Sequence, residues 1–211
     1  MSEVFGSLPL VAILRGLHPG EAVAVGKTLI DAGFRALEVP LNSPAPLTSI
    51  RRLADTCGAG CLIGAGTVMT VDEVDAVAAA GGRLIVMPHV DAEVIAHAVQ
   101  AGLVCVPGVA TISEAFAGLR AGASALKAFP GAQVTPDVLR AWRAVLPHAF
   151  AVLPVGGVTP ATMPAYVDAG ASGFGIGSAL YKPGRSIHDI AAAAAAFVAA
   201  WQACSRDKQS S

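Results

Sequence analysis

Short apolar runs recur along the chain, and each is followed by a stretch of helical periodicity that ends at a small-residue turn. The runs are apolar throughout instead of alternating with polar residues, which is typical of parallel strands covered on both faces. The expected strands lie within 9–16, 36–42, 61–68, 84–90, 104–111, 125–130, 151–158 and 173–181. The expected helices lie near 19–32, 45–55, 71–80, 91–101, 112–121, 135–145, 160–169 and 186–201. This order predicts an α/β fold built on parallel strands.

Eight strand–helix units in 211 residues leave about 26 residues for each unit, close to the minimum for a closed (β/α)8 barrel. The alternative, an open doubly wound sheet, normally carries a glycine-rich dinucleotide turn after its first strand. Here the first expected strand ends in Leu14, Arg15 and Gly16, which favours the barrel. We expect a single (β/α)8 TIM-barrel domain over 1–211, with a short N-terminal cap near 1–8 and a C-terminal helix near 186–204.

The charge balance limits the partners that the chain can have. It contains 14 Lys and Arg against 15 Asp and Glu, so it lacks the positive surplus that nucleic-acid binding needs. Glu3 and Arg15 interrupt the N-terminal apolar segment, unlike a signal peptide. The Ala-rich stretch 190–204 is too short and too weakly apolar to span a membrane. We therefore expect a cytoplasmic protein with neither a nucleic-acid nor a membrane partner.

Three charged residues, Arg15, Glu38 and Lys127, interrupt the apolar runs near their carboxyl ends, whereas nearly all other charges fall in expected helices and turns. In a barrel these ends converge on one mouth, where active sites are built. Burial disfavours a charged amine, so it lowers the pKa of Lys127 and supplies the neutral nucleophile that forms a Schiff base with a ketone. Glu38 can then move protons. We hypothesise an imine-forming lyase; the alternative is a buried ion network that only holds the barrel together.

Glycine-rich turns follow the last two expected strands. Gly156 and Gly157 precede a helix start at Thr159 and Pro160, and Gly177 and Ser178 end the final run. Glycines let backbone N–H groups approach an anion, and these two positions are where barrels usually bind phosphate. The alternative is that the turns serve packing alone. A further glycine turn at 64–67 lacks the third glycine of a dinucleotide fingerprint and is better suited to a substrate carboxylate beside Thr67.

The cysteines, His89, Asn42 and the other lysines give less evidence of function than the residues above. Four cysteines stand at 57, 61, 105 and 204, and Cys57 and Cys61 have no histidine nearby in sequence to complete a zinc site, so we expect free thiols. His89, at the end of its strand, and Asn42 are left without an assigned role. Besides Lys127, the chain has Lys27, Lys182 and Lys208, which we expect to be solvated.

Through these residues the chain resembles the family of 2-keto-3-deoxy-6-phosphogluconate and 2-keto-3-deoxy-6-phosphogalactonate aldolases. The resemblance runs from residue 8 to about 200, through the motifs LVAILRG, LEVPLNSP, IGAGTV, MPHVD, VPGVAT, ALKAFP, PVGGVTP and GFGIGSALY. It implies a class I aldolase on a (β/α)8 barrel, a homotrimer, with no metal and no cofactor. Its small-molecule partners would be a phosphorylated keto acid and pyruvate.

The resemblance also implies a role for each residue that matches a family motif. Lys127 is similar to the Schiff-base lysine and Glu38 to the general acid and base. Arg15 and Thr67 match contacts on the carboxylate side of the substrate, and Pro88 matches a proline that lines the pyruvyl pocket. The residues that match the phosphate site are Gly156, Gly157, Gly177 and Ser178.

Two positions resemble the galactonate branch of the family more than the gluconate branch. The gluconate branch tends to carry an arginine in the motif EVTLRT, where this chain has Asn42, and a threonine where this chain has Val155. A threonine hydroxyl can hydrogen-bond one configuration of the C4 hydroxyl, whereas valine cannot. The expected reaction is cleavage of 2-dehydro-3-deoxy-6-phospho-D-galactonate to pyruvate and D-glyceraldehyde 3-phosphate. The alternatives are aldolases for the gluconate epimer or for 4-hydroxy-2-oxoglutarate, and, more distantly, a phosphosugar isomerase or a non-catalytic binding barrel.

Overall fold

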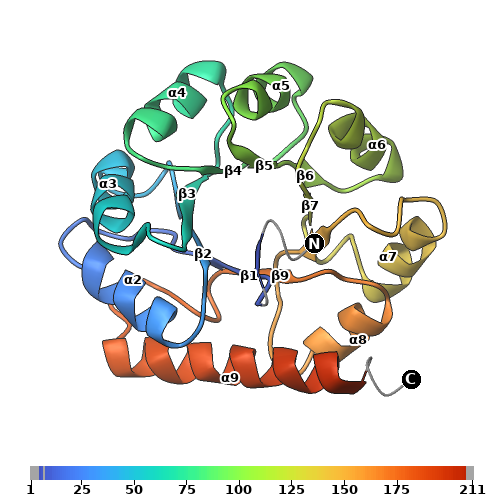
Figure 1. The fold of residues 1–211 in the computed structure, drawn as a ribbon. Coiled ribbons are helices and arrows are strands. Elements are labelled where there is room, and N and C mark those ends of the chain that lie inside the picture. Colours follow the sequence, from blue (N-terminus) through green and yellow to red (C-terminus); the bar gives the residue numbers. More distant parts are fainter. Residues whose placement is uncertain (1–4, 7, 208–211) are drawn as a thin grey trace.

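Parallel strands alternate with helices along the chain, as the apolar pattern predicts (Figure 1). The computed structural model describes residues 5–6 and 8–207. The strands are β1 (Leu10–Ile13), β2 (Ala36–Pro40), β3 (Leu62–Gly66), β4 (Leu84–Val86), β5 (Val104–Val106), β6 (Gly108–Val109), β7 (Leu126–Ala128), β8 (Val152–Pro154) and β9 (Phe174–Ile176). The helices are α2 (Ala22–Asp31), α3 (Pro46–Cys57), α4 (Val71–Ala79), α5 (Ala92–Gln100), α6 (Ile112–Arg120), α7 (Pro136–Arg143), α8 (Met163–Asp168) and α9 (Ile187–Asp207).

The hydrogen-bonded ladders form two parallel sheets. One has the strand order β5-β4-β3-β2-β1-β9, and the other has the order β6-β7-β8. An isolated parallel bridge between Val155 and Gly175 connects the end of β8 to β9. The parallel α/β fold is therefore confirmed, but among the described residues the ladders do not run into one closed ring.

Pro107 explains why the fifth expected strand is split in two. The run 104–111 was expected as one strand, but it forms β5 and β6 on either side of this proline. Proline has no N–H to donate and therefore interrupts a ladder. Gly108, which follows it, packs so closely on the chain after β4 that a Cβ there would lie 2.5 Å from the carbonyl oxygen of Pro88. The break is where the first sheet ends and the second begins.

The side chains of the strands alternate between two apolar regions. Val11, Val86, Val106 and Leu153 belong to an inner cluster that the strands enclose, and Phe5 contacts the same cluster. Their neighbours along each strand face the helices and join the larger outer core. Both faces of the strands are buried for this reason, and the runs are apolar throughout. Apart from residues 5, 6 and 8, the N-terminal cap expected near 1–8 lies outside the described residues.

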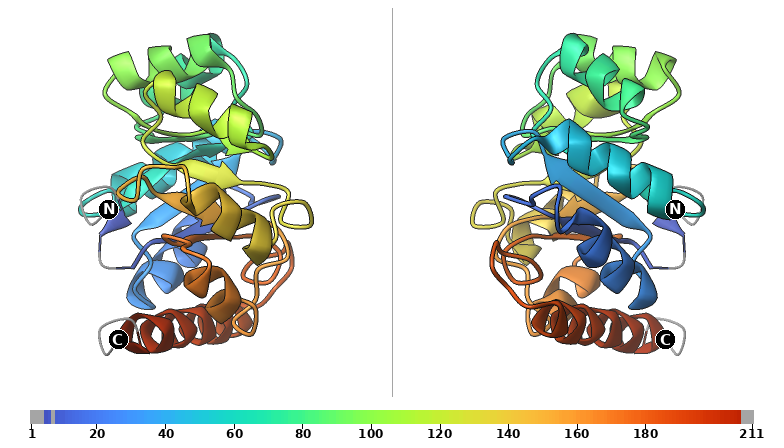
Figure 2. Two further views of the ribbon diagram at one scale, coloured as in Figure 1. Left: turned by 90° about the vertical axis from the view of Figure 1, so that its right-hand side faces the viewer. Right: turned by 90° about the vertical axis from the view of Figure 1, so that its left-hand side faces the viewer.

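Helix α9 is longer than the C-terminal helix expected from the sequence. Its segment 187–206 is long and apolar enough to cross a membrane by length and composition, which corrects the expectation that this stretch is too short. Its buried residues Ile190, Ala194 and Phe197 join the outer core, and the helix contacts α2 and α8 along the outside of the strands (Figure 2). This packing accounts for its apolar residues without a membrane.

Most helices begin where the sequence predicts, and α6 shows the reason. The Thr111 hydroxyl accepts the N–H of Glu114 at 3.3 Å, and the Glu114 carboxylate accepts the N–H of Thr111 at 2.9 Å. This capping box satisfies two backbone donors that the first turn leaves free. Helix α8 differs, because it begins at Met163, after a turn, and not near residue 160.

We expect Thr111→Ala to lower the free energy of unfolding by about 1 kcal/mol, because it removes the cap at the start of α6. Thr28→Ala is the matched control: this hydroxyl bonds the Ala24 carbonyl inside α2, where alanine is the better helix former. Urea denaturation of both variants measures the two changes. Equal losses of stability in both variants would contradict the assigned role of the cap.

Candidate active site

The carboxylate of Glu38 is buried at the carboxyl end of β2. Glu38 lies between Ile13 of β1 and Gly64 of β3, and only 2% of the residue is exposed. Its carboxylate reaches over Gly66, where an added Cβ would lie 2.0 Å from Oε2. Only glycine at position 66 leaves room for the carboxylate. In the described part of the chain Oε2 has no hydrogen-bond partner, which is unusual for a buried oxygen and typical of a functional group.

Lys127 approaches the same place from the other sheet. It lies on β7 between Gly108 of β6 and Leu153 of β8, and 8% of the residue is exposed. Its Nζ is 4.6 Å from the centre of the Phe129 ring, a cation–π distance. Among the described residues, no ion pair within 4 Å joins Lys127 to Glu38. The amine is therefore held near the carboxylate without being neutralised by it.

Burial shifts the pKa of each group in the direction that favours its uncharged form. It raises the pKa of Glu38 to about 7, against the opposing charges of Lys127 and Arg15. It lowers the pKa of Lys127, an effect that Glu38 opposes and Arg15 reinforces. A carboxyl group whose pKa is near the working pH can both give and take a proton, and an amine with a lowered pKa is more often the free nucleophile. These directions suit the acid–base roles predicted for the pair, which stay a prediction.

Glu38 and Lys127 line a narrow pocket, here called the inner pocket. The rest of its wall is apolar, apart from the backbone of one glycine, and consists of Val11, Ile13, Val86, Val106, Leu153, Val155 and Gly175. Its free space is about 10 Å³, enough for about one water molecule. The inner pocket lies directly on the inner apolar cluster, whose Val11, Val86, Val106 and Leu153 form its wall. Low hydration of both ionisable groups follows from this wall.

A larger cavity of about 770 Å³, here called the outer cavity, adjoins the inner pocket. The two share Ile13, Val155 and Gly175 as lining residues. The predicted site residues that line the outer cavity are Arg15, Val155, Gly156, Gly157, Gly177 and Ser178. Backbone N–H groups of Gly157, Gly177 and Ser178 donate to no other group in residues 5–6 and 8–207. Free N–H groups at a cavity wall favour an anion.

Arg15 connects the outer cavity to the segment that distinguishes the two family branches. Its Nη1 donates a hydrogen bond to Oδ1 of Asn42 at 2.8 Å. The adjacent Gly16 N–H donates to the buried hydroxyl of Ser43 at 3.0 Å. Asn42 therefore orients the arginine, a role that the sequence analysis left open.

Thr67 and Pro88 lie at the expected end of the strands but outside the two cavities. Thr67 follows β3 with a φ of +59°, a left-handed backbone that a β-branched residue seldom adopts. Pro88 follows β4 and is half-buried. Neither lines the inner pocket or the outer cavity, nor does the exposed His89. Of Thr67, Pro88 and His89, only Thr67 has a strained backbone, and such strain is often found at functional sites.

Sequence reasoning missed two basic residues of the outer cavity, Lys182 and Arg185. Lys182 is exposed, as expected, and it also lines the outer cavity. Its place in the loop after the last strand, beside the glycine turn, is the signal that would have found it. Lys27 is exposed on α2, and Lys208 lies outside the described residues.

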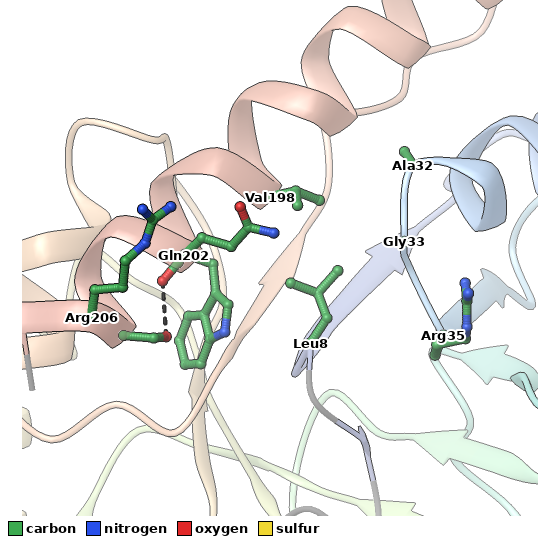
Figure 3. A pocket seen from close by; sticks show the side chains of 9 residues that line it. Leu8, Ala32, Gly33, Arg35, Val198, Gln202 and Arg206 are labelled. Carbon is green, nitrogen blue, oxygen red and sulfur yellow. Dashed lines mark hydrogen bonds between the residues drawn. The ribbon is translucent and has the colours of Figure 1, made fainter. Parts of the chain in front are cut away.

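A cavity of about 560 Å³ lies at the opposite, amino-terminal ends of the strands, between α9 and the turn from α2 to β2 (Figure 3). Leu8, Gly33 and Arg35 line one side, and Val198 and Gln202 of α9 line the other. The Arg35 guanidinium already donates to the carbonyls of Ile30 and Phe34. This cavity contains neither member of the buried pair, and the active site is assigned to the carboxyl ends.

Comparison with known proteins identifies the family to which the chain belongs. The aldolase family model described as "KDPG and KHG aldolase" matches residues 1–193. A 2-dehydro-3-deoxy-6-phosphogalactonate aldolase of Escherichia coli is 50% identical over 195 residues, which are 92% of this chain and 95% of that protein. A 2-dehydro-3-deoxy-phosphogluconate aldolase of Pseudoalteromonas atlantica is 31% identical over 79% of this chain and 77% of its own length.

A solved structure described as native KDPGal superposes with a TM-score of 0.93 and 49% identity, covering 95% of this chain and 97% of that chain. Fold and site thus define an α/β enzyme of the aldolase class, which is a class of carbon–carbon lyases. The chain belongs to the KDPG and KHG aldolase family.

The raised pKa of Glu38 predicts that stability depends on pH. Because the folded state holds this proton more tightly than the unfolded state, its contribution to stability is complete below pH 4.5 and is lost as the pH rises through 7. Glu38→Gln removes the charge and therefore stabilises the folded protein relative to the parent. We expect this increase in the free energy of unfolding to be about 2 kcal/mol larger at pH 8 than at pH 5.

Urea denaturation at both pH values measures this difference, and Glu93→Gln on the exposed face of α5 is the control. A gain for Glu38→Gln that is equal at the two pH values would contradict the buried, partnerless carboxylate.

Proposed function

We propose that this protein is a class I aldolase that cleaves 2-dehydro-3-deoxy-6-phospho-D-galactonate to pyruvate and D-glyceraldehyde 3-phosphate. One observation carries the proposal: Lys127 and Glu38 line the same narrow, apolar pocket without forming an ion pair. An amine in such a pocket is suited to attack a ketone, and a carboxyl group beside it is suited to move protons.

The proposed reaction begins when the neutral amine of Lys127 attacks the C2 ketone. Glu38 gives a proton to the carbinolamine oxygen, which leaves as water and yields the protonated imine. The carboxylate then accepts the C4 hydroxyl proton as the C3–C4 bond breaks. The electron pair of that bond moves into the imine and forms an enamine, while D-glyceraldehyde 3-phosphate leaves. Protonation of C3 and addition of water release pyruvate and restore Lys127. The imine is the electron sink, so these steps use no metal and no cofactor.

The substrate would lie in the outer cavity, with its pyruvyl half against the wall that this cavity shares with the inner pocket and with its carboxylate toward Arg15. The roles of Thr67 and Pro88, which line neither cavity, rest on the family resemblance alone. The phosphate would occupy the outer cavity against the glycine turns, whose free N–H groups support this assignment. The unphosphorylated 4-hydroxy-2-oxoglutarate, the alternative within this family, would leave those groups unused.

The galactonate epimer is proposed on two grounds. Val155 is buried, lines both cavities and offers no hydroxyl to the C4 oxygen. The relative named for the galactonate is 50% identical to this chain, and the relative named for the gluconate is 31% identical. Both epimers can undergo the same bond cleavage, so we propose a preference and not an exclusive specificity.

We also propose that the parallel strands act as one (β/α)8 barrel and that 1–211 is a single domain. The bridge between Val155 and Gly175 supports this, as does the Ser124 N–H, which donates to the carbonyl of Cys105 at 2.8 Å and joins the end of β5 to the chain before β7. A cytoplasmic homotrimer is proposed on the family resemblance. A related chain, 48% identical, belongs to a cage described as built from symmetric oligomeric domains.

Reduction with borohydride in the presence of pyruvate is expected to attach a pyruvyl group covalently to Lys127, because reduction makes the imine irreversible. Peptide mass spectrometry locates the modification. Lys127→Met should abolish it, whereas the matched variant Lys27→Met on the surface of α2 should retain it. A modified lysine other than Lys127, or no modification at all, would overturn the assignment.

Val155→Thr is expected to shift the ratio of kcat/KM toward the gluconate epimer by about tenfold, because the new hydroxyl can bond one configuration at C4. Measurement of kcat/KM with both synthetic epimers gives the ratio. The control is Val99→Thr, the same substitution at an exposed position of α5 that lines neither cavity. An unchanged ratio in Val155→Thr would locate the epimer preference elsewhere.

A further inference from the structure

We propose that Lys182 is a phosphate-specificity residue that supplies the positive charge of the phosphate site. The inference rests on the proposed function, because it takes the outer cavity as the place of the substrate's phosphate. It adds a residue outside the glycine turns, on the loop between β9 and α9.

The charged residues that line the outer cavity are all basic. They are Arg15, Lys182 and Arg185, and no Asp or Glu is among the lining residues. The chain as a whole has a net charge of −1, so this local excess is not a general property of the surface. A cavity with charges of one sign attracts the opposite charge, here an anion such as a phosphate dianion.

Two of the three cations are engaged by the protein, and Lys182 is not. Arg15 donates to Asn42, and Nη1 of Arg185 donates to the carbonyls of Ala179 and Leu180 at 2.7 and 2.8 Å. Arg185 therefore holds the turn that contains Ser178. The Lys182 carbonyl accepts the Arg185 N–H at 3.1 Å, but its side-chain ammonium has no hydrogen-bond or ion-pair partner within residues 5–6 and 8–207. Its ammonium group is thus available for a ligand.

The loop holds Lys182 from both sides. The buried Tyr181 hydroxyl donates to Oε1 of Glu21 at 2.7 Å, across 160 residues of sequence. Pro183 packs against Gly16, where an added Cβ would lie 2.7 Å from the proline Cγ. Both contacts join the loop to the segment between β1 and α2, which carries Arg15. Lys182 is therefore presented on a fixed backbone and not on a free surface loop.

This arrangement divides phosphate recognition between two kinds of donor. The backbone N–H groups of the glycine turns are neutral and match the shape of the phosphate. Lys182 adds a full positive charge, and charge-assisted hydrogen bonds are stronger than neutral ones. Loss of that charge should weaken phosphate recognition selectively.

The test compares kcat/KM for the phosphorylated substrate with kcat/KM for its unphosphorylated analogue. Lys182→Gln is expected to reduce the preference for the phosphorylated form about tenfold, mainly through KM, because it removes one charge-assisted hydrogen bond. Lys182→Arg should restore most of the preference. Lys27→Gln removes the same charge from the exposed surface of α2 and should leave the preference as it is in the parent.

A Lys182→Gln variant with the parent's preference would overturn the proposal, and so would equal losses on both substrates. A parent protein that cleaves neither substrate would refute the proposed function instead. In that case, calorimetric titration with glycerol 3-phosphate still decides the role of Lys182: about tenfold weaker binding by Lys182→Gln supports it, and unchanged binding overturns it.

Discussion

An amine and a carboxylate share one apolar pocket in this protein without neutralising each other. Removing both groups from water disfavours their charged forms, and a direct ion pair would reverse that effect by holding both in the charged state. Glu38 lies on β2 of one sheet and Lys127 on β7 of the other, and no ion pair within 4 Å joins them among the described residues. Gly66 provides the space that the carboxylate occupies. The proposed chemistry depends on this separation.

The rest of the fold supports that pocket. The inner faces of β1, β4, β5 and β8 supply a valine and leucine floor beneath the pair, and the glycine turns after β8 and β9 open the adjoining cavity. An unpaired buried carboxylate lowers stability when it is charged, so the apolar core has to compensate for it. The same burial that destabilises the fold brings the pKa of Glu38 into the range in which it can exchange protons.

The sequence was sufficient for the order of the elements and for the buried pair, because periodicity and charges in apolar runs are local signals. It was not sufficient for the break at Pro107, since one apolar run can belong to two sheets. It indicated that Thr67 and Pro88 lie at the carboxyl ends of their strands, but strand position does not determine which side chains reach a cavity. Lys182 was missed because its own local pattern is that of any loop lysine, and only its place after the last glycine turn distinguishes it.

The most direct measurement of the central claim is the titration of Glu38 itself. Carbon-13 NMR of protein labelled at the glutamate carboxyl carbons follows each side chain with pH, and Glu38→Gln identifies the signal. The account predicts a midpoint at about 7 for this carboxyl group. A midpoint near the ordinary value of 4.5 would show a hydrated or ion-paired carboxylate and would contradict the account.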